Sequence, residues 1–191
     1  DSLNAAKYEQ AVSFFEAGKY IQAITLFERA HDYGDSADYL IKSASLAAES
    51  YYQQGDYRSC VNLCESRQVY PDVYRAACYY YALSLKESEN YSDAVDYFDK
   101  ADGYLDSNEL KQSCKIDSDY SLAISYMYSR RFTDAINLFT SLDNYKSSQE
   151  YLSLCNTYAK YNGWWLCKGH SAYDLNIEVL PLRSGDILYE V

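Results

Sequence analysis

The chain has 191 residues, of which 28 are acidic and 17 basic, and its formal net charge is −11 at pH 7. A field of this sign repels a phosphate backbone, which argues against nucleic-acid binding. Only two prolines and seven glycines interrupt the sequence, so a mostly helical fold is favoured over one with many strands. No apolar run approaches the roughly 18 residues that a membrane-spanning helix needs.

One pattern occurs four times, each time around an aromatic anchor at Tyr20, Tyr57, Tyr91 and Phe132. An alanine precedes every anchor by nine residues, and apolar residues follow it after three, four and seven. In the first copy these positions are Ala11, Ala23, Ile24 and Phe27. Because the later positions fall on one helical face, each copy is predicted to be a hairpin of two helices, helix A before the anchor and helix B after it.

Small and turn-forming residues mark the ends of these helices. The alanines let helix A and helix B approach closely. Glycine precedes the anchor by two residues in the first two copies, whereas Glu89 and Arg130 occupy that place later, so the last two turns are expected to form without its φ freedom. The residues predicted to cap the next helix A are Asp35, Asp72, Asp106 and Ser147.

This pattern resembles the tetratricopeptide repeat, over roughly residues 4–160. The residues that match its signature one for one are Ala11, Gly18, Tyr20, Ala23, Phe27 and Ala30. The family usually has proline where one repeat passes to the next, and this chain has Asp or Ser after tyrosine instead. That Tyr-x-Asp-Ser ending resembles divergent repeats of bacterial membrane-anchored surface proteins.

The resemblance and the pattern together predict an all-α fold, an α-α superhelix of about four helical hairpins plus a capping helix, with a small C-terminal β-hairpin tail. The repeat domain is expected over residues 1–161. Its parts are repeats at about 4–35, 36–72, 73–106 and 107–147 and a capping helix at 148–161. The longer third interval, at Lys115–Asp119, either extends helix A of the fourth copy or kinks it.

The pattern changes in residues 162–191, where apolar and polar residues alternate as in a strand. A second strand is expected at Ile187–Val191. This tail packs on the helices, pairs with another chain in self-association, or opens a β domain that continues. Trp164 and Trp165 are interpreted as anchors of the junction, with stacking on a sugar or partner as the alternative.

No motif for catalysis or cofactor binding is visible in the sequence. Glycine-rich phosphate loops and nucleophile elbows are missing. His31 and His170 lie outside any nucleophile-and-base arrangement. None of the six cysteines forms a C-x-x-C pair, so they are interpreted as small core residues rather than metal ligands. We expect no enzyme activity, cofactor or metal, and leave open a cytoplasmic location or a membrane-anchored surface protein.

In the family that the chain resembles, helices A line a concave groove that binds a peptide. By position, the resemblance implies a groove of Tyr8, Val12, Phe15, Glu49, Tyr52, Tyr79, Leu83, Lys86, Tyr120, Ile124, Met127 and Tyr128. The Lys and Asn residues that clamp a terminal carboxylate in some members are replaced, which argues against that ligand. The alternative for each single tyrosine is packing between helices.

The sequence therefore predicts a non-enzymatic scaffold that binds a partner peptide or protein in this groove. A second hypothesis is a cell-surface protein that binds or senses a ligand, for example a carbohydrate, through its C-terminal β segment. A third is an enzyme whose carboxylates come from different repeats.

Overall fold

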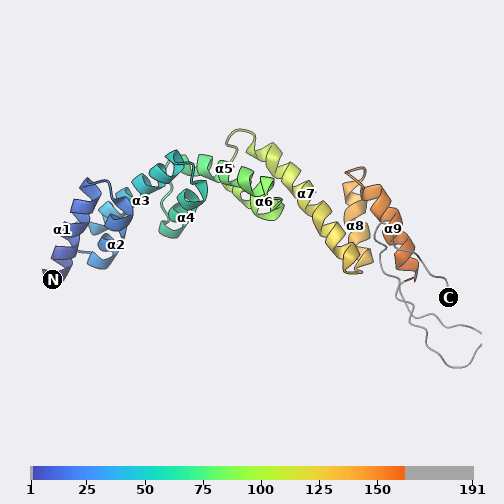
Figure 1. The fold of residues 1–191 in the computed structure, drawn as a ribbon, viewed down its shortest axis with the longest axis horizontal. Helices are drawn as coiled ribbons and strands as arrows, with labels where there is room; N and C mark the ends of the chain where they lie inside the picture. Colours follow the sequence, from blue (N-terminus) through green and yellow to red (C-terminus); the bar gives the residue numbers. More distant parts are fainter. Residues whose placement is uncertain (1, 162–191) are drawn as a thin grey trace, which may run out of the picture. The chain divides into compact units, whose positions relative to one another are not determined.

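The structure is a computed structural model that describes residues 2–161, and this part of the chain is entirely helical (Figure 1). Its helices are α1 (Ser2–Glu16), α2 (Tyr20–Ala30), α3 (Ser36–Gln53), α4 (Tyr57–Arg67), α5 (Val73–Glu87), α6 (Tyr91–Lys100), α7 (Ser107–Tyr128), α8 (Phe132–Leu142) and α9 (Ser148–Tyr161). The predicted helical fold is confirmed for these residues. The predicted β-hairpin lies outside them.

The helices form consecutive pairs, and α9 follows the fourth pair (Figure 1). Within each pair, small residues make close packing possible, since Ala11 on α1 and Ala23 on α2 are fully buried. The bulky residue seven positions after the anchor fills the adjoining space: Phe27, Phe98 and Phe139 are each at most 1 % exposed. The repeated positions therefore form the core, as their spacing predicts.

All four turns between helix A and helix B have the same backbone conformation. Gly18 and Gly55 have φ values of 70° and 75°, and Glu89 and Arg130 reach 60° and 59° without being glycine. In the first turn the N–H of Lys19 donates to the carbonyl of Phe14 at 2.8 Å. The equivalent hydrogen bond recurs in the other three turns. This is the left-handed C-terminal ending of a helix. In the last two turns, Glu89 and Arg130 adopt it with a side chain present, without the φ freedom of glycine.

Two of the predicted caps of the helices A are wrong in their hydrogen bonding. Asp35 and Asp72 stand at the N-cap positions of α3 and α5, yet neither side chain accepts a capping hydrogen bond. Oδ1 of Asp106, before α7, accepts a hydrogen bond from the hydroxyl of Tyr79. Capping occurs at two helices B, where Asp56 accepts from the N–H of Ser59 at 3.1 Å and Asn90 caps α6.

Buried serines begin three of the later helices A: Ser36, Ser107 and Ser148 are at most 1 % exposed. The hydroxyls of Ser36 and Ser148 donate to the carbonyls of Tyr33 and Tyr145, three residues earlier. This bond folds the chain back at the end of a repeat. In these two turns the serine is therefore a structural residue, and Asp35, which precedes Ser36, does not cap α3. The buried hydroxyl of Ser107 has no hydrogen-bond partner among the described residues.

Two compact units divide the chain, residues 1–114 and 115–191, and the boundary falls within α7. The first unit contains α1–α6 and the start of α7, with a core around Ala48, Val61 and Phe98. The second has its own core around Ala123 and Phe139, formed by α7, α8 and α9. The extra residues of the third interval thus extend α7 to 22 residues, which is the first of the two predicted outcomes.

The cysteines of the described chain lie in these cores. Cys60, Cys64, Cys78, Cys114 and Cys155 are each at most 1 % exposed. Burial raises the pKa of Cys78 and of Cys155 to about 11, so both thiols stay protonated at neutral pH. The interpretation of these five as core residues is confirmed, while Cys167 lies outside the described residues.

Candidate functional site

The twelve predicted groove residues lie on α1, α3, α5 and α7, all of them helices A. Eight belong to the first unit and four to the second, so each set is described within its own unit. The exposed fraction differs widely among these twelve residues. Tyr79 is 7 % and Met127 only 2 % exposed, whereas Tyr128 is 56 % exposed. The first two offer a partner almost no surface.

A recurring aromatic cluster explains the tyrosines at the first position of the predicted groove. In the first copy, Tyr8 on α1 contacts Phe27, Tyr33 and Tyr39, with ring centroids 5.9, 5.8 and 6.2 Å away. Phe15 also contacts Tyr39, at 5.1 Å and nearly perpendicular. Edge-to-face contacts of this kind stabilise a core beyond the area they bury. Tyr8 and Phe15 are therefore packing residues, with only part of each ring left at the surface.

Tyr79 takes the same position in the third copy, against Phe98 and Tyr104 at 5.9 and 5.6 Å. Its hydroxyl donates to Oδ1 of Asp106 at 2.6 Å. That hydrogen bond, together with burial, raises the pKa of Tyr79 to about 12. Tyr79 thus ties α5 to the segment before α7 and is a structural residue.

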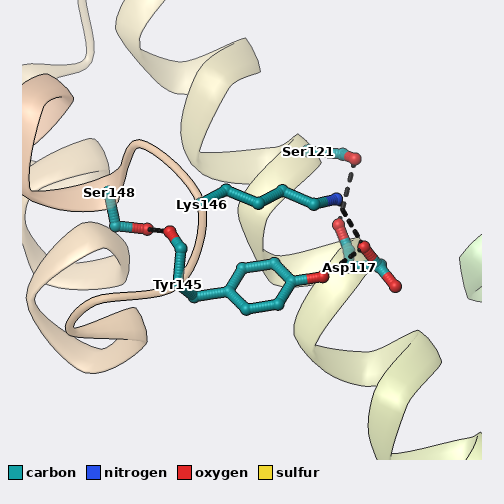
Figure 2. Close-up of polar contacts among 5 residues, drawn as sticks. All are labelled: Asp117, Ser121, Tyr145, Lys146 and Ser148. Carbon is teal, nitrogen blue, oxygen red and sulfur yellow. Dashed lines mark hydrogen bonds and ion pairs between the residues drawn. The ribbon is translucent and has the colours of Figure 1, made fainter.

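Tyr120 repeats the arrangement in the second unit, where it contacts Phe139, Tyr145 and Tyr151. A polar network lies beside it, centred on Asp117 (Figure 2). Oδ1 of Asp117 accepts from the hydroxyl of Tyr145 and from Nζ of Lys146, both at 2.6 Å. The Asp117 side chain is 12 % exposed, so this near-buried carboxylate is paired with a cation.

The same network reaches the start of α9. Ser148 donates to the carbonyl of Tyr145 at 2.6 Å, and Lys146 lies between them in the loop (Figure 2). The hydrogen bond to Asp117 raises the pKa of Lys146, while burial raises that of Tyr145. Lys146 therefore stays charged and Tyr145 neutral at physiological pH. These groups satisfy one another, which indicates that they fix α7 to the loop before α9.

A set of half-exposed tyrosines brings three helices of the first unit together. Tyr52 on α3, Tyr57 on α4 and Tyr80 on α5 form what we call the tyrosine trio. The rings of Tyr57 and Tyr80 stack at 4.9 Å with an interplanar angle of 23°. Tyr52 lies 5.6 and 6.4 Å from them. Partial burial raises the pKa of Tyr52, and the neighbouring Tyr104 and Tyr80 add to that effect.

Two members of the trio were not among the predicted groove residues. The sequence places Tyr57 in the turn as an anchor, and the resemblance places Tyr80 at a position where some family members have a carboxylate-clamp residue. The run Tyr79-Tyr80-Tyr81 gave a signal, because consecutive residues on a helix point to different faces. One of the three had to be buried, and another had to point away from the core.

Shallow hollows occur at equivalent positions of two repeats. One, of about 300 Å³, lies between the start of α2 and the end of α3 and includes Lys19, Tyr20 and Ala47. Another, of about 350 Å³, lies between α8 and α9 and includes Arg131, Phe132 and Ala159. Both form where an alanine leaves room beside the anchor of the preceding repeat. They follow from the repeat geometry.

Comparison with known families matches these helices to one profile. The model of "Anaphase-promoting complex, cyclosome, subunit 3", a tetratricopeptide-type repeat family, matches residues 16–101. The matched stretch begins at the end of α1 and runs through α6. The match supports a tetratricopeptide-like helical repeat protein. No curated protein and no solved structure gives a significant match.

Tetratricopeptide-like repeats generally mediate protein–protein interaction, and they are typically non-enzymatic scaffolds. They bind proteins or peptides. In this repeat protein, no helix among residues 2–161 is long and apolar enough to span a bilayer.

Proposed function

We propose that this tetratricopeptide-like protein is a scaffold that binds a partner protein or peptide on a surface of its first unit, along α3 and α5 and beside the start of α4. The observation that carries the proposal is the tyrosine trio. Its three rings contact one another, and each keeps part of its surface exposed. Tyrosines held in this way offer apolar contact area at little further cost in conformational entropy.

The neighbouring groove residues support this placement. Glu49, Leu83 and Lys86 are each half-buried, and all three lie on the same two helices as Tyr52 and Tyr80. A mixed surface of aromatic, aliphatic and charged groups is typical of interaction sites, in which a few aromatic anchors carry most of the binding energy. Val12 on α1 is half-buried and forms a secondary part of the proposal in the first unit. In the second unit, exposed Tyr128 and half-buried Ile124 form a separate secondary part.

A photoreactive benzophenone amino acid placed at Leu83 tests the proposal in the organism that expresses the protein. We expect a discrete cross-linked partner, which mass spectrometry identifies and which is then purified. The combined change Tyr52→Ala and Leu83→Ala should weaken binding of this partner at least about tenfold in calorimetry. Circular dichroism and thermal unfolding establish that the variant keeps its helices.

Ile41 supplies the matched control, because it is 53 % exposed and also lies on α3. The cross-linker at this position should not capture the same partner, and Ile41→Ala should leave the affinity unchanged. Equal capture at Ile41 and Leu83, or no capture at Leu83, would refute a binding site on this surface. The other hypothesis, ligand binding through residues 162–191, concerns residues that the structure does not describe.

A further inference from the structure

The described part of the chain holds several of its own cations in one recurring way, between a tyrosine ring and a carboxylate. Nζ of Lys100 lies 4.3 Å from the ring centroid of Tyr97 and 2.7 Å from Oε1 of Glu65. The guanidinium carbon of Arg131 lies 4.1 Å from the ring of Tyr126, and its Nε is 2.7 Å from Asp134. Both arrangements join cation–π attraction to an ion pair.

Lys146 is the third case, and it shows that more than one ring can contribute. Its Nζ lies 5.1 Å from the ring of Tyr120 and 5.0 Å from that of Tyr145. The carboxylate is that of Asp117, at 2.6 Å. In all three cases, therefore, the tyrosine faces and the acidic group meet a cation from the same chain.

The tyrosine trio has the rings and the acid but lacks the cation. Glu49 precedes Tyr52 by three residues on α3, so the two side chains lie on one face of the helix. Within residues 2–161, no lysine or arginine lies over a ring of the trio, and no cation pairs with Glu49. Glu49 and the trio are all half-buried, so they remain accessible.

The charge of the first unit has the matching sign. Residues 1–114 contain 19 acidic and 10 basic residues. This excess of negative charge attracts a basic partner and raises the rate at which it meets the surface. An acidic partner would be repelled by the same field.

We propose that Glu49 and the tyrosine trio form a site for a lysine or arginine side chain of a basic partner peptide. The proposal rests on the proposed function, since it gives the chemistry of the partner at that same surface. The partner's cation would lie against the exposed part of these rings and pair with the Glu49 carboxylate, as Lys100 does with Tyr97 and Glu65. Arginine suits such a site better than lysine, because its planar guanidinium also stacks on aromatic rings.

Two synthetic peptides test this chemistry on the intact chain by calorimetry. One alternates glycine with arginine, and the other replaces each arginine by citrulline, which has the same shape but no charge. We expect the arginine peptide to bind at least about tenfold more tightly at moderate salt. Equal affinity for the two peptides, or no binding of the arginine peptide, would overturn the proposal.

Variants then separate the site from the general negative field. Glu49→Gln should weaken binding of the arginine peptide by about three- to tenfold. Glu9→Gln changes the net charge equally, at an exposed residue of α1 that is not part of the site, and should have little effect. Tyr52→Leu should weaken binding in a protein whose fold is checked by circular dichroism. Equal losses of affinity in Glu49→Gln and Glu9→Gln would show that the peptide binds only through non-specific attraction, and would refute the site.

Failure of the cationic site can be distinguished from failure of the proposed scaffold function. A partner captured at Leu83 whose affinity is insensitive to Glu49→Gln would refute the cationic site and leave the scaffold function in place. Failure of capture at Leu83 would refute the scaffold function at this surface.

Discussion

Single residues in the turns between helices hold a conformation that their side chains disfavour. Glu89 has φ 60° in the position where the first two copies have glycine. A residue with a side chain is strained by roughly 1–2 kcal/mol in the left-handed region. Glycine avoids this strain, but it also makes the unfolded chain more flexible, which offsets part of the gain in stability. The four turns are otherwise alike, so they form a set in which this cost can be measured.

Replacing Glu89 by glycine should therefore stabilise the protein, by about 0.5–1 kcal/mol. The reverse change, Gly55→Ala, should destabilise it by about 1 kcal/mol, because a Cβ there meets no atom within 4 Å and only the backbone conformation opposes it. Urea unfolding of both variants measures the two values. A loss of stability in Glu89→Gly would show that the glutamate makes a compensating interaction.

Gly34 differs from these turn glycines in its surroundings. Its φ is 57°, and an added Cβ would lie 3.2 Å from the ring of Tyr8. The equivalent residues Leu105 and Lys146 adopt the same left-handed conformation with side chains. Glycine in the first copy therefore makes room for the aromatic cluster, in addition to serving the backbone.

Helix α7 contributes residues to the cores of both units. Its fixed point in the second unit is Asp117, which binds Tyr145 and Lys146 in the loop before α9. Removing the carboxylate leaves the hydroxyl of Tyr145 without its acceptor in a partly buried place, whereas Lys146 is 47 % exposed and can turn to water.

Asp117→Ala should accordingly destabilise the protein by about 2–3 kcal/mol, and Lys146→Gln by less than about 1 kcal/mol. The comparison is made by urea unfolding at neutral pH, with amide hydrogen exchange in α8 and α9 to locate the effect. Equal effects of the two changes would mean that the ion pair, and not the burial of the carboxylate, determines the stability.

The elements could be predicted from the sequence because their signals are local and repeated. The spacing of Ala11, Ala23 and Phe27 fixes one face of each helix, and it recurs in four copies. The burial of individual tyrosines could not be predicted in this way. Tyr79 and Tyr80 are adjacent in sequence, yet the first is buried against Phe98 and the second stacks on Tyr57.

The polar contacts could not be predicted from the sequence either. Asp106 is a residue type that often caps helices and it directly precedes α7, but the hydroxyl of Tyr79 on α5 donates to its carboxylate. Asp117 lies in the extra residues of the third interval and has no equivalent in the other copies, so no repetition could point to it. Both depend on side chains that lie 27 or 28 residues away along the chain.

At the scale of the whole molecule, the tyrosines should make the free energy of unfolding fall at alkaline pH. The pKa is raised by burial for Tyr52, Tyr74, Tyr97, Tyr145 and Tyr151, and by the hydrogen bond to Asp106 for Tyr79. A raised pKa means that the folded state keeps a proton that the unfolded chain releases near pH 10. The stabilisation is thus fully present below pH 10 and is lost as the pH rises above it.

Tyr79 allows this dependence to be measured, since its pKa rises from 10.0 to about 12. Between these values the free energy of unfolding should fall by on the order of 2 kcal/mol from this residue alone. Tyr79→Phe should be less stable than the parent at neutral pH, because the hydrogen bond to Asp106 is lost, but should decline less steeply above pH 10. Urea unfolding across this pH range, followed with tyrosinate absorbance, compares the two proteins. Parallel curves would show that Tyr79 titrates alike in both states, and the alkaline loss would then belong to the other five tyrosines.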